Sequence, residues 1–190
     1  ASDWSSDVCS SDPRLLPDTE LVSPHAPYRY DVAPQGRQWF SIRDFSPEML
    51  LAGVRETAPI LNQFIDEQLA RTGLSDDRLA LVGFSQGAMM ALFVALRRTQ
   101  LMTGVIGYSG RMVGMETTAD EVKSRPPVLL IHGASDDLIP ADAMLETAQN
   151  LALSAIGAQW HICSNLGHGI DQAGLEIGGR FLRDCFTGMA

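Results

Sequence analysis

A serine between two glycines stands at a junction where a strand is expected to meet a helix. It is Ser85, at the centre of a G-x-S-x-G motif over residues 83–87, where a sharp turn is expected to exclude side chains larger than glycine at both flanking positions. An apolar run over 78–84 enters the motif and a mostly apolar run over 86–98 leaves it, which is the strand–turn–helix setting of a nucleophile elbow. There, backbone N–H groups at the start of the helix can stabilise an oxyanion. We therefore predict that Ser85 is a nucleophile; a buried serine in a glycine-rich turn is the alternative.

A serine hydroxyl is a weak nucleophile unless a base removes its proton. The chain has four histidines that could do so. His25 lies in a proline-rich loop, His161 lies inside a predicted strand, and His132 lies at a strand end, where a structural role is expected. His168 lies between two glycines after the last predicted strand, at the edge where sites form in parallel α/β sheets. The sequence therefore favours His168 as the base, with a solvated loop histidine as the alternative.

The third member of such a site is a carboxylate that fixes the histidine tautomer and stabilises the imidazolium. Asp136 and Asp137 both follow shortly after a predicted strand. One of them is expected to orient the histidine and the other to be solvated, and the residues alone leave the choice open. With either aspartate the chain order is Ser, Asp, His, which is the order of α/β hydrolases.

Other chemistries find little support in the sequence. By residue type, a metal could be bound by His161, Cys163, His168 and Cys185, but their spacing matches no zinc-site pattern. The motif over 83–87 is not followed by Lys and Ser or Thr, so it is no phosphate-binding loop. We therefore expect neither a metal nor another cofactor.

Composition narrows the class of protein. The 190 residues fit one domain at roughly 150 residues per domain. Hydrophobic residues are 45% and the formal net charge is -9, so a core can form, while nucleic acid or an anionic membrane would repel the protein. No apolar run approaches ~18 residues, so no transmembrane helix is expected. The three cysteines suit a reducing compartment, so we expect a cytoplasmic protein that acts on a small molecule.

Strand-like and helix-like segments alternate along the chain. A helix is expected to begin at Ser46-Pro47-Glu48 and to end at Gly73, because these residues carry capping signals. Such alternation predicts an α/β fold, with a mainly parallel sheet and helices on both faces. The predicted strands are residues 19–23, 78–84, 104–108, 127–132 and 159–163; the other predicted helices are 86–98, 141–156 and 170–186; and residues 24–46 are expected to form a surface loop.

The first residues of the chain look unlike the remainder. Residues 1–12 are rich in serine and aspartate and have almost nothing to bury, as in a disordered leader. Residues 3–12, DWSSDVCSSD, also resemble the translation of a sequencing adapter. We therefore expect residues 1–12, with Cys9, to be a non-native segment and residues 13–190 to form the domain.

From about Leu15 to Phe186 the chain resembles the phospholipase/carboxylesterase family of α/β hydrolases, which includes the acyl-protein thioesterases. The resemblance rests on segments that surround the residues already singled out and on two segments of the long loop. They are LVSPHAP at 21–27, GRQWFS at 36–41, VGFSQG at 82–87, HGASDDLIP at 132–140 and Gly-His at 167–168. The resemblance implies hydrolysis of carboxylic esters or thioesters through an acyl-enzyme, without a cofactor.

The resemblance also implies residue roles. It makes Ser85 the nucleophile and His168 the base, and it makes Asp136, four residues after the strand-end histidine, the acid. The N–H of Gln86, which follows the nucleophile, would form half of the oxyanion hole.

Two aromatic residues of the loop take a role from the resemblance as well. Trp39 and Phe40 occupy the place of a loop that borders the acyl pocket in the family. Ordinary loop packing is the alternative.

The chain departs from the family pattern in one respect. Family members begin with strands that end in a loop of the His-Gly-x-Gly type, which supplies the second oxyanion donor, and this chain has no such loop. We therefore expect an α/β-hydrolase domain that is truncated at its N-terminus and lacks a central strand between residues 19–23 and 78–84. The alternatives to an active serine carboxylesterase are an inactive fragment of one and a non-catalytic binding protein of the same fold.

Overall fold

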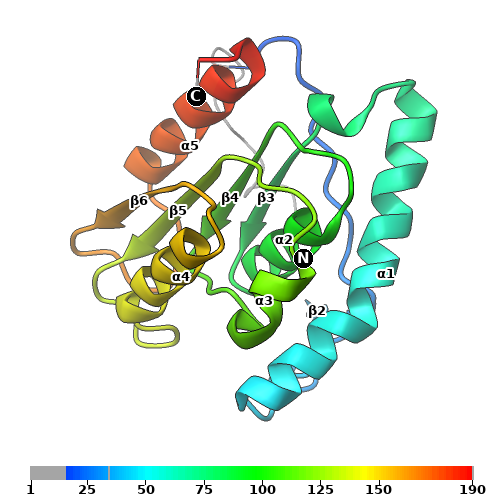
Figure 1. Cartoon of the computed structure of the whole chain (residues 1–190). Helices are drawn as coiled ribbons and strands as arrows, with labels where there is room; N and C mark the ends of the chain where they lie inside the picture. Colours follow the sequence, from blue (N-terminus) through cyan, green and yellow to red (C-terminus); the bar gives the residue numbers. More distant parts are fainter. Residues whose placement is uncertain (1–15, 34, 190) are drawn as a thin grey trace.

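The computed structural model describes residues 16–33 and 35–189 (Figure 1). Their centre is a parallel four-stranded sheet with the strand order β3-β4-β5-β6, as the alternating pattern predicted. The strands are β3 (Ala80–Phe84), β4 (Gly104–Tyr108), β5 (Val128–Gly133) and β6 (Ala158–Cys163). Each lies within two residues of its predicted bounds. Residues 1–12, with Cys9, lie outside the described residues.

Helices cover both faces of this sheet (Figure 1). On one face lie α2 and α4, with α1 and α3 packed beside them, and α5 covers the opposite face. The helices are α1 (Pro47–Thr72), α2 (Gln86–Arg97), α3 (Met115–Glu121), α4 (Ala141–Leu153) and α5 (Gln172–Thr187). The predicted layers are therefore confirmed.

Alternate side chains of the central strands supply the two hydrophobic cores. On β5, Val128 and Leu130 pack into the core formed with α1, α2 and α4. Leu129 and Ile131, which point to the other face, pack with Phe181 of α5. Strands buried on both faces are expected to be continuously apolar, which explains why these runs were readable in the sequence.

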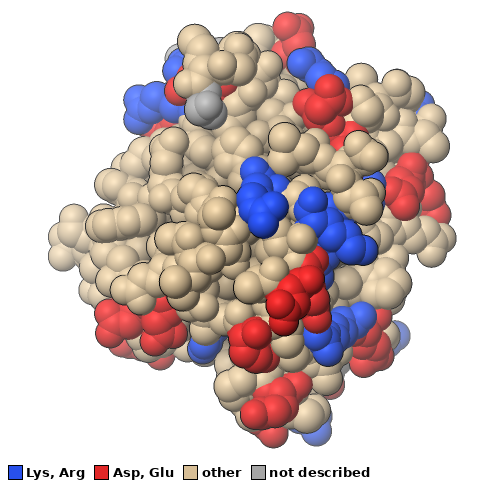
Figure 2. Space-filling view, in the orientation of Figure 1, with Lys and Arg blue, Asp and Glu red and all other residues tan. Residues whose placement is uncertain are grey.

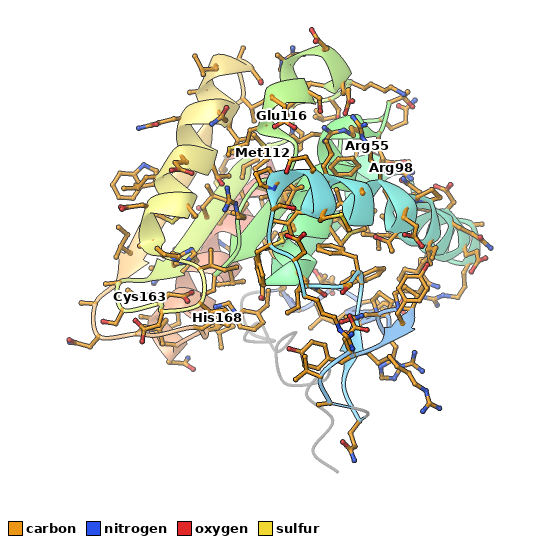
Figure 3. All side chains as sticks on the ribbon, turned by 90° about the horizontal axis from the view of Figure 1, so that it is seen from below. Arg55, Arg98, Met112, Glu116, Cys163 and His168 are labelled. Carbon is orange, nitrogen blue, oxygen red and sulfur yellow. The ribbon has the colours of Figure 1, made fainter. Side chains whose placement is uncertain are left out.

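The long helix α1 has the predicted ends. Pro47 occupies its first turn and Gly73 follows its last, with φ 70° in the left-handed region that glycine adopts readily. Arg98, which follows α2, donates hydrogen bonds to Asp66 (2.8 Å) on α1 and to Asp76 (2.6 Å), which lies shortly after α1. These bonds hold the end of α1 against α2. Arg55 of α1 and Arg98 lie on the α1 side of the molecule in Figure 3.

Some charged side chains on the surface lie beside opposite charges. Glu121 of α3 accepts hydrogen bonds from Arg97 at the end of α2 (2.7 Å) and from Arg55 of α1 (2.5 Å). Figure 2 shows basic and acidic side chains next to one another on this face, with broad uncharged areas between them. No helix among the described residues has the length and apolar character needed to cross a bilayer.

Three local predictions differ from the structure. Residues 19–23 form no strand, because no described strand lies beside them to accept their hydrogen bonds. The predicted loop contains a small antiparallel pair, β1 (Tyr28–Arg29) with β2 (Arg37–Gln38). The short helix α3 was not predicted, since Thr118 is its single buried residue and its sequence has no apolar periodicity.

One edge of the sheet borders a large cleft. Among the described residues, β3 pairs with β4 alone. A cleft of about 1130 Å³ runs along the other edge of β3, between α1, α5 and residues of the 16–42 segment, and reaches Ser85. Val82 of β3 is 39% exposed there, whereas every residue of β4 and β5 is buried.

Candidate active site

Ser85 occupies a strained turn between β3 and α2. Its φ of 53° and ψ of −116° lie in a region that residues other than glycine rarely adopt. The turn is held by main-chain hydrogen bonds: the Ser85 N–H donates to the carbonyl of Tyr108 (2.9 Å), and the Ser85 carbonyl accepts from Ala88 (3.0 Å). The serine hydroxyl is therefore fixed at the N-terminus of α2, beyond the carboxyl end of β3.

The two glycines of the motif have different surroundings. A Cβ on Gly83 would lie 2.2 Å from the main chain of Gly87, so the turn requires glycine at 83. A Cβ on Gly87 would have no described atom within 4 Å apart from its chain neighbours and the backbone of its own helix. The expectation that both flanking positions exclude larger side chains is therefore right for Gly83 and wrong for Gly87, whose Cβ position is open.

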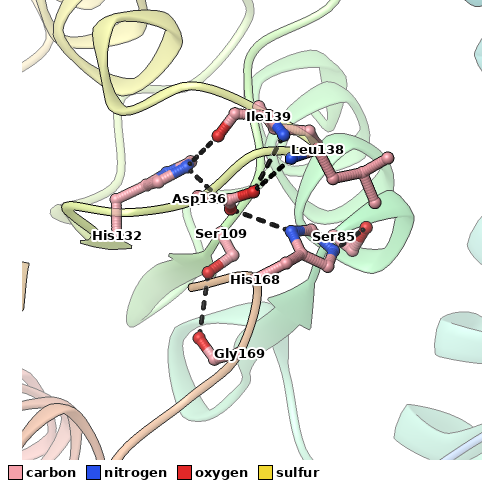
Figure 4. Close-up of polar contacts among 8 residues, drawn as sticks. All are labelled: Ser85, Ser109, His132, Asp136, Leu138, Ile139, His168 and Gly169. Atoms are coloured by element: carbon pink, nitrogen blue, oxygen red, sulfur yellow. Dashed lines mark hydrogen bonds and ion pairs between the residues drawn. The ribbon is translucent and has the colours of Figure 1, made fainter. Parts of the chain in front are cut away.

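The structure brings His168 between Ser85 and Asp136, as Figure 4 shows. The Nε2 atom of His168 lies 3.0 Å from the Ser85 Oγ, and its Nδ1 lies 2.8 Å from Oδ2 of Asp136. A proton on Nδ1 donates to the carboxylate and leaves the Nε2 lone pair to accept the serine hydroxyl proton. Residues 83 positions apart in the chain are thereby joined in one hydrogen-bonded series.

Asp136 is held more firmly than its neighbour Asp137. Its Oδ1 accepts hydrogen bonds from the backbone N–H groups of Leu138 and Ile139, both at 2.9 Å. Burial acts to raise the pKa of Asp136, but the N–H of Ile139, His168 and the N–H of Leu138 outweigh it, and the net pKa is lowered. Asp137 is exposed, so the structure places Asp136, and not Asp137, against His168.

His132, for which a structural role was expected, is a neighbour of this carboxylate. It is 1% exposed, and its Nε2 donates to the carbonyl of Ile139 (2.7 Å) and lies 3.2 Å from Oδ2 of Asp136 (Figure 4). Asp136 thus lies between two imidazoles. The four-residue spacing between His132 and Asp136 across the end of β5 is the signal that could have indicated this contact.

Gln86 contributes both its main chain and its side chain. As the first residue of α2, it has an N–H group without a partner inside the helix. Its side-chain amide accepts from the N–H of Trp39 (3.0 Å) and donates to the carbonyl of Phe40 (2.8 Å). The residue after Ser85 therefore fixes the 39–40 segment beside the motif, a contact that sequence reasoning missed.

The two aromatic residues predicted to border an acyl pocket have different places. Trp39 lines the cleft that reaches Ser85, as does Leu138, whose side chain is 54% exposed. Phe40 is 3% exposed and packs in the core against α1, where a Cβ on Gly53 would lie 2.6 Å from it. Ordinary packing, the alternative stated for this pair, therefore describes Phe40, while Leu138 joins Trp39 at the cleft.

Cysteines and metal ligands form no second centre in the part of the chain that the structure describes. No three or more His, Cys, Asp or Glu residues there are arranged to hold a metal ion. Burial, together with Asp171, raises the pKa of the Cys163 thiol to about 11. Cys163 ends β6 and lies on the same side of the molecule as His168 (Figure 3), but it remains a thiol at neutral pH.

The chain is similar to known esterases over most of its length. A profile of the phospholipase/carboxylesterase family matches residues 9–186. Esterase YpfH of Escherichia coli K12 is 32% identical over 145 residues, a match that covers 76% of this chain and 61% of that protein. The chain therefore spans about three-fifths of the length of that relative.

The chain is also similar to acyl-protein thioesterases and to proteins of known structure. Acyl-protein thioesterase 1 of Gibberella zeae is 25% identical over 183 residues, covering 88% of this chain and 77% of that protein. The crystal structure of esterase PE8 superposes with a TM-score of 0.82 at 38% identity, covering 85% of this chain and 76% of that one. Arabidopsis thaliana SOBER1, at 18% identity, shares the fold with a TM-score of 0.75, covering 95% of this chain and 94% of its own.

Proposed function

Because the chain belongs to the phospholipase/carboxylesterase family of α/β hydrolases, we propose that it is a serine hydrolase that cleaves carboxylic esters through an acyl-enzyme. The observation that carries the proposal is the hydrogen-bonded series Asp136–His168–Ser85, which ends in a serine at the rim of an apolar cleft. An esterase, YpfH, and acyl-protein thioesterases are among the relatives, which supports the same reaction class.

In the first step, the Ser85 Oγ attacks the ester carbonyl carbon. Its proton passes to Nε2 of His168, which lies 3.0 Å away. The imidazolium that forms donates through Nδ1 to the Asp136 carboxylate, whose lowered pKa keeps it ionised at neutral pH. His168 then protonates the departing alkoxide, and the acyl group stays on Ser85.

The developing oxyanion is stabilised at the start of α2. The N–H of Gln86 has no helical partner and lies beside Ser85, so it can donate to the carbonyl oxygen as that oxygen gains charge. The positive end of the α2 dipole acts in the same direction. Gln86 supplies one donor of the oxyanion hole.

The second step releases the acid. A water molecule takes the place of the alcohol, gives a proton to His168 and attacks the acyl carbonyl. His168 returns that proton to the Ser85 Oγ as the acyl bond breaks. Every proton in the cycle moves between Ser85, His168, the substrate and water.

The end of the cleft that reaches Ser85 indicates the kind of substrate. Its lining is largely apolar near Trp39 and Leu138, which suits the hydrocarbon part of an ester or thioester of a carboxylic acid. The thioesterases among the relatives favour thioesters as further candidates, and lysophospholipase-like protein 1 of Mus musculus, another relative, favours lysophospholipids. Cys163 and Cys185 are free thiols, and we place the protein in the cytoplasm, whose reducing conditions keep thiols free.

Replacement of the proposed nucleophile tests the function. Ser85→Ala should lower hydrolysis of p-nitrophenyl butyrate by several orders of magnitude, because the residual rate comes from binding and the oxyanion hole alone. Ser75→Ala is the control, since Ser75 is exposed and precedes the opposite end of β3. Equal loss in both variants, or activity retained in Ser85→Ala, would refute the proposal.

A further inference from the structure

The chain that leaves β4 contacts both halves of the proposed catalytic series. Ser109 directly follows β4 and is fully buried. Its N–H donates to the carbonyl of Ile131 on β5 (2.8 Å), and its hydroxyl donates to the carbonyl of Gly169 (2.9 Å). Gly169 is the residue after His168, and Figure 4 shows this contact beside the histidine.

The loop that carries His168 is held on each side of the histidine. Before it, the carbonyl of Leu166 accepts from the N–H of Ser135 (2.9 Å). After it, the carbonyl of Gly169 accepts from the Ser109 hydroxyl. The first contact is made by main-chain atoms, whereas the second depends on a side chain. A substitution at 109 can therefore release one side of the loop and leave the other in place.

The same segment also contacts the turn of the nucleophile. The carbonyl of Tyr108 accepts from the Ser85 N–H at 2.9 Å. A Cβ on Gly110 would lie 2.5 Å from the Cβ of Ala88 and 2.9 Å from the carbonyl oxygen of Ser85. Residues 108–110 are therefore packed against the serine turn while Ser109 holds the histidine loop.

The backbone conformation of Ser109 is strained for a residue that has a side chain. Its φ is 45°, in the left-handed region where glycine is most easily accommodated. Glycine would relieve this strain but has no hydroxyl to donate to Gly169. The side chain does not reach solvent, so it contacts no substrate.

We propose that Ser109 is a positioning residue, whose hydroxyl fixes the Gly169 carbonyl and thereby holds His168 within hydrogen-bond distance of both Ser85 and Asp136. The inference rests on the proposed function. It assigns Ser109 no contact with the substrate: the residue acts through the histidine.

Two replacements at 109 and one control separate positioning from general stability. Ser109→Gly removes the hydroxyl and relieves the backbone strain, and Ser109→Ala removes the hydroxyl and keeps the strain. The control is Ser124→Ala, which removes another buried serine hydroxyl, one that donates to the carbonyl of Ala95 (2.8 Å), away from the site. Rates are expressed per active serine, counted by titration with a fluorophosphonate.

Both variants at 109 should lose roughly 10- to 100-fold in kcat with p-nitrophenyl butyrate, because small displacements of a catalytic group are costly. KM should change by less than about twofold, since Ser109 touches no substrate. Ser124→Ala should keep its kcat whatever it loses in stability. The inference is refuted if the Ser109 variants keep kcat within about twofold of the original, or if Ser124→Ala loses as much.

A second measurement does not depend on turnover. The Nδ1–H proton of His168, which faces Asp136, should give an NMR signal whose exchange with water becomes at least about tenfold faster in both Ser109 variants and not in Ser124→Ala. Unchanged exchange in the Ser109 variants overturns the inference. Activity retained in Ser85→Ala would overturn the proposed function instead, and the His168 signal would still decide whether Ser109 positions the ring.

Discussion

At the scale of single residues, two adjacent aspartates have different surroundings. Asp136 accepts two backbone hydrogen bonds and contacts His168, whereas Asp137 is exposed. The residues alone left the choice between them open, and family spacing favoured Asp136. The structure agrees with that spacing, because in the loop after β5 the carboxylate of Asp136 is buried and accepts from the N–H of Ile139 and contacts His168.

Replacing each aspartate by asparagine should separate their roles. Asp136→Asn removes the charge that fixes the His168 tautomer, so kcat for ester hydrolysis should fall by up to ~10⁴. Asp137→Asn should change kcat by less than about tenfold, because Asp137 is exposed and solvent screens its charge. Steady-state kinetics of both variants on one ester measure the difference. A larger loss in Asp137→Asn would assign the acid to Asp137.

Contacts made by side chains across the fold were the least predictable features of the site. The types and order of the residues were enough to single out Ser85 and His168, and the family spacing added Asp136. The contact of His132 with Asp136 had only their four-residue spacing as a signal. The contact of the Gln86 side chain with the 39–40 segment depends on a loop conformation that no local pattern specifies. For the same reason the burial of Phe40 was not predicted.

At the scale of elements, the turn from β3 to α2 places different demands on its two glycines. Gly83→Ala should lower the free energy of unfolding by about 1–3 kcal/mol or more, because its Cβ would overlap the main chain of Gly87. Gly87→Ala should be neutral or stabilising by up to about 1 kcal/mol, because alanine favours a helix and the position is open. Urea unfolding of both variants measures this. Equal destabilisation would contradict the geometry of the turn.

Strands and helices could be predicted where their buried residues form a regular pattern of apolar residues in the sequence. The strands β3 to β6 are apolar runs, and α1 repeats its buried residues on one face, so their positions followed from the sequence. The two wrong predictions, at residues 19–23 and at α3, each have a physical reason. Residues 19–23 have a strand-like composition but no described neighbour to pair with, and α3 buries little. Secondary structure that depends on a partner, or that packs weakly, leaves little trace in a single sequence.

At the scale of the whole molecule, the edge of β3 away from β4 has no strand paired with it among the described residues. The main chains of Leu79 and Ser85 bond to the β4 side, so alternate residues of β3, such as Val82, turn their N–H and C=O groups toward the cleft. Apolar residues of α1 and α5 line the same cleft. A strand paired with this edge would satisfy these groups, and we propose that a further strand fills the part of the cleft along β3, leaving the end beside Ser85, Trp39 and Leu138 to the substrate.

A chimaera tests this proposal. In it, residues 1–12 are replaced by the N-terminal segment of a relative that carries the His-Gly-x-Gly loop. Compared with the 190-residue chain, the chimaera should be more soluble, and its kcat should be higher by roughly 10²–10³, because the added loop supplies a second oxyanion donor. A control chimaera with the loop glycines replaced by proline should keep the solubility and lose the gain in rate. Equal solubility and equal kcat/KM of the chain and the first chimaera would refute the proposal.

The central claim is that Ser85, activated by His168, forms the acyl-enzyme, and active-site labelling tests it most directly. The protein is treated with a fluorophosphonate probe, and the modified residue is located by mass spectrometry of its peptides. We expect one modified residue, Ser85, with labelling abolished in Ser85→Ala and strongly slowed in His168→Ala, which removes the base 3.0 Å from the serine oxygen. Labelling of another serine, or undiminished labelling in Ser85→Ala, would contradict it.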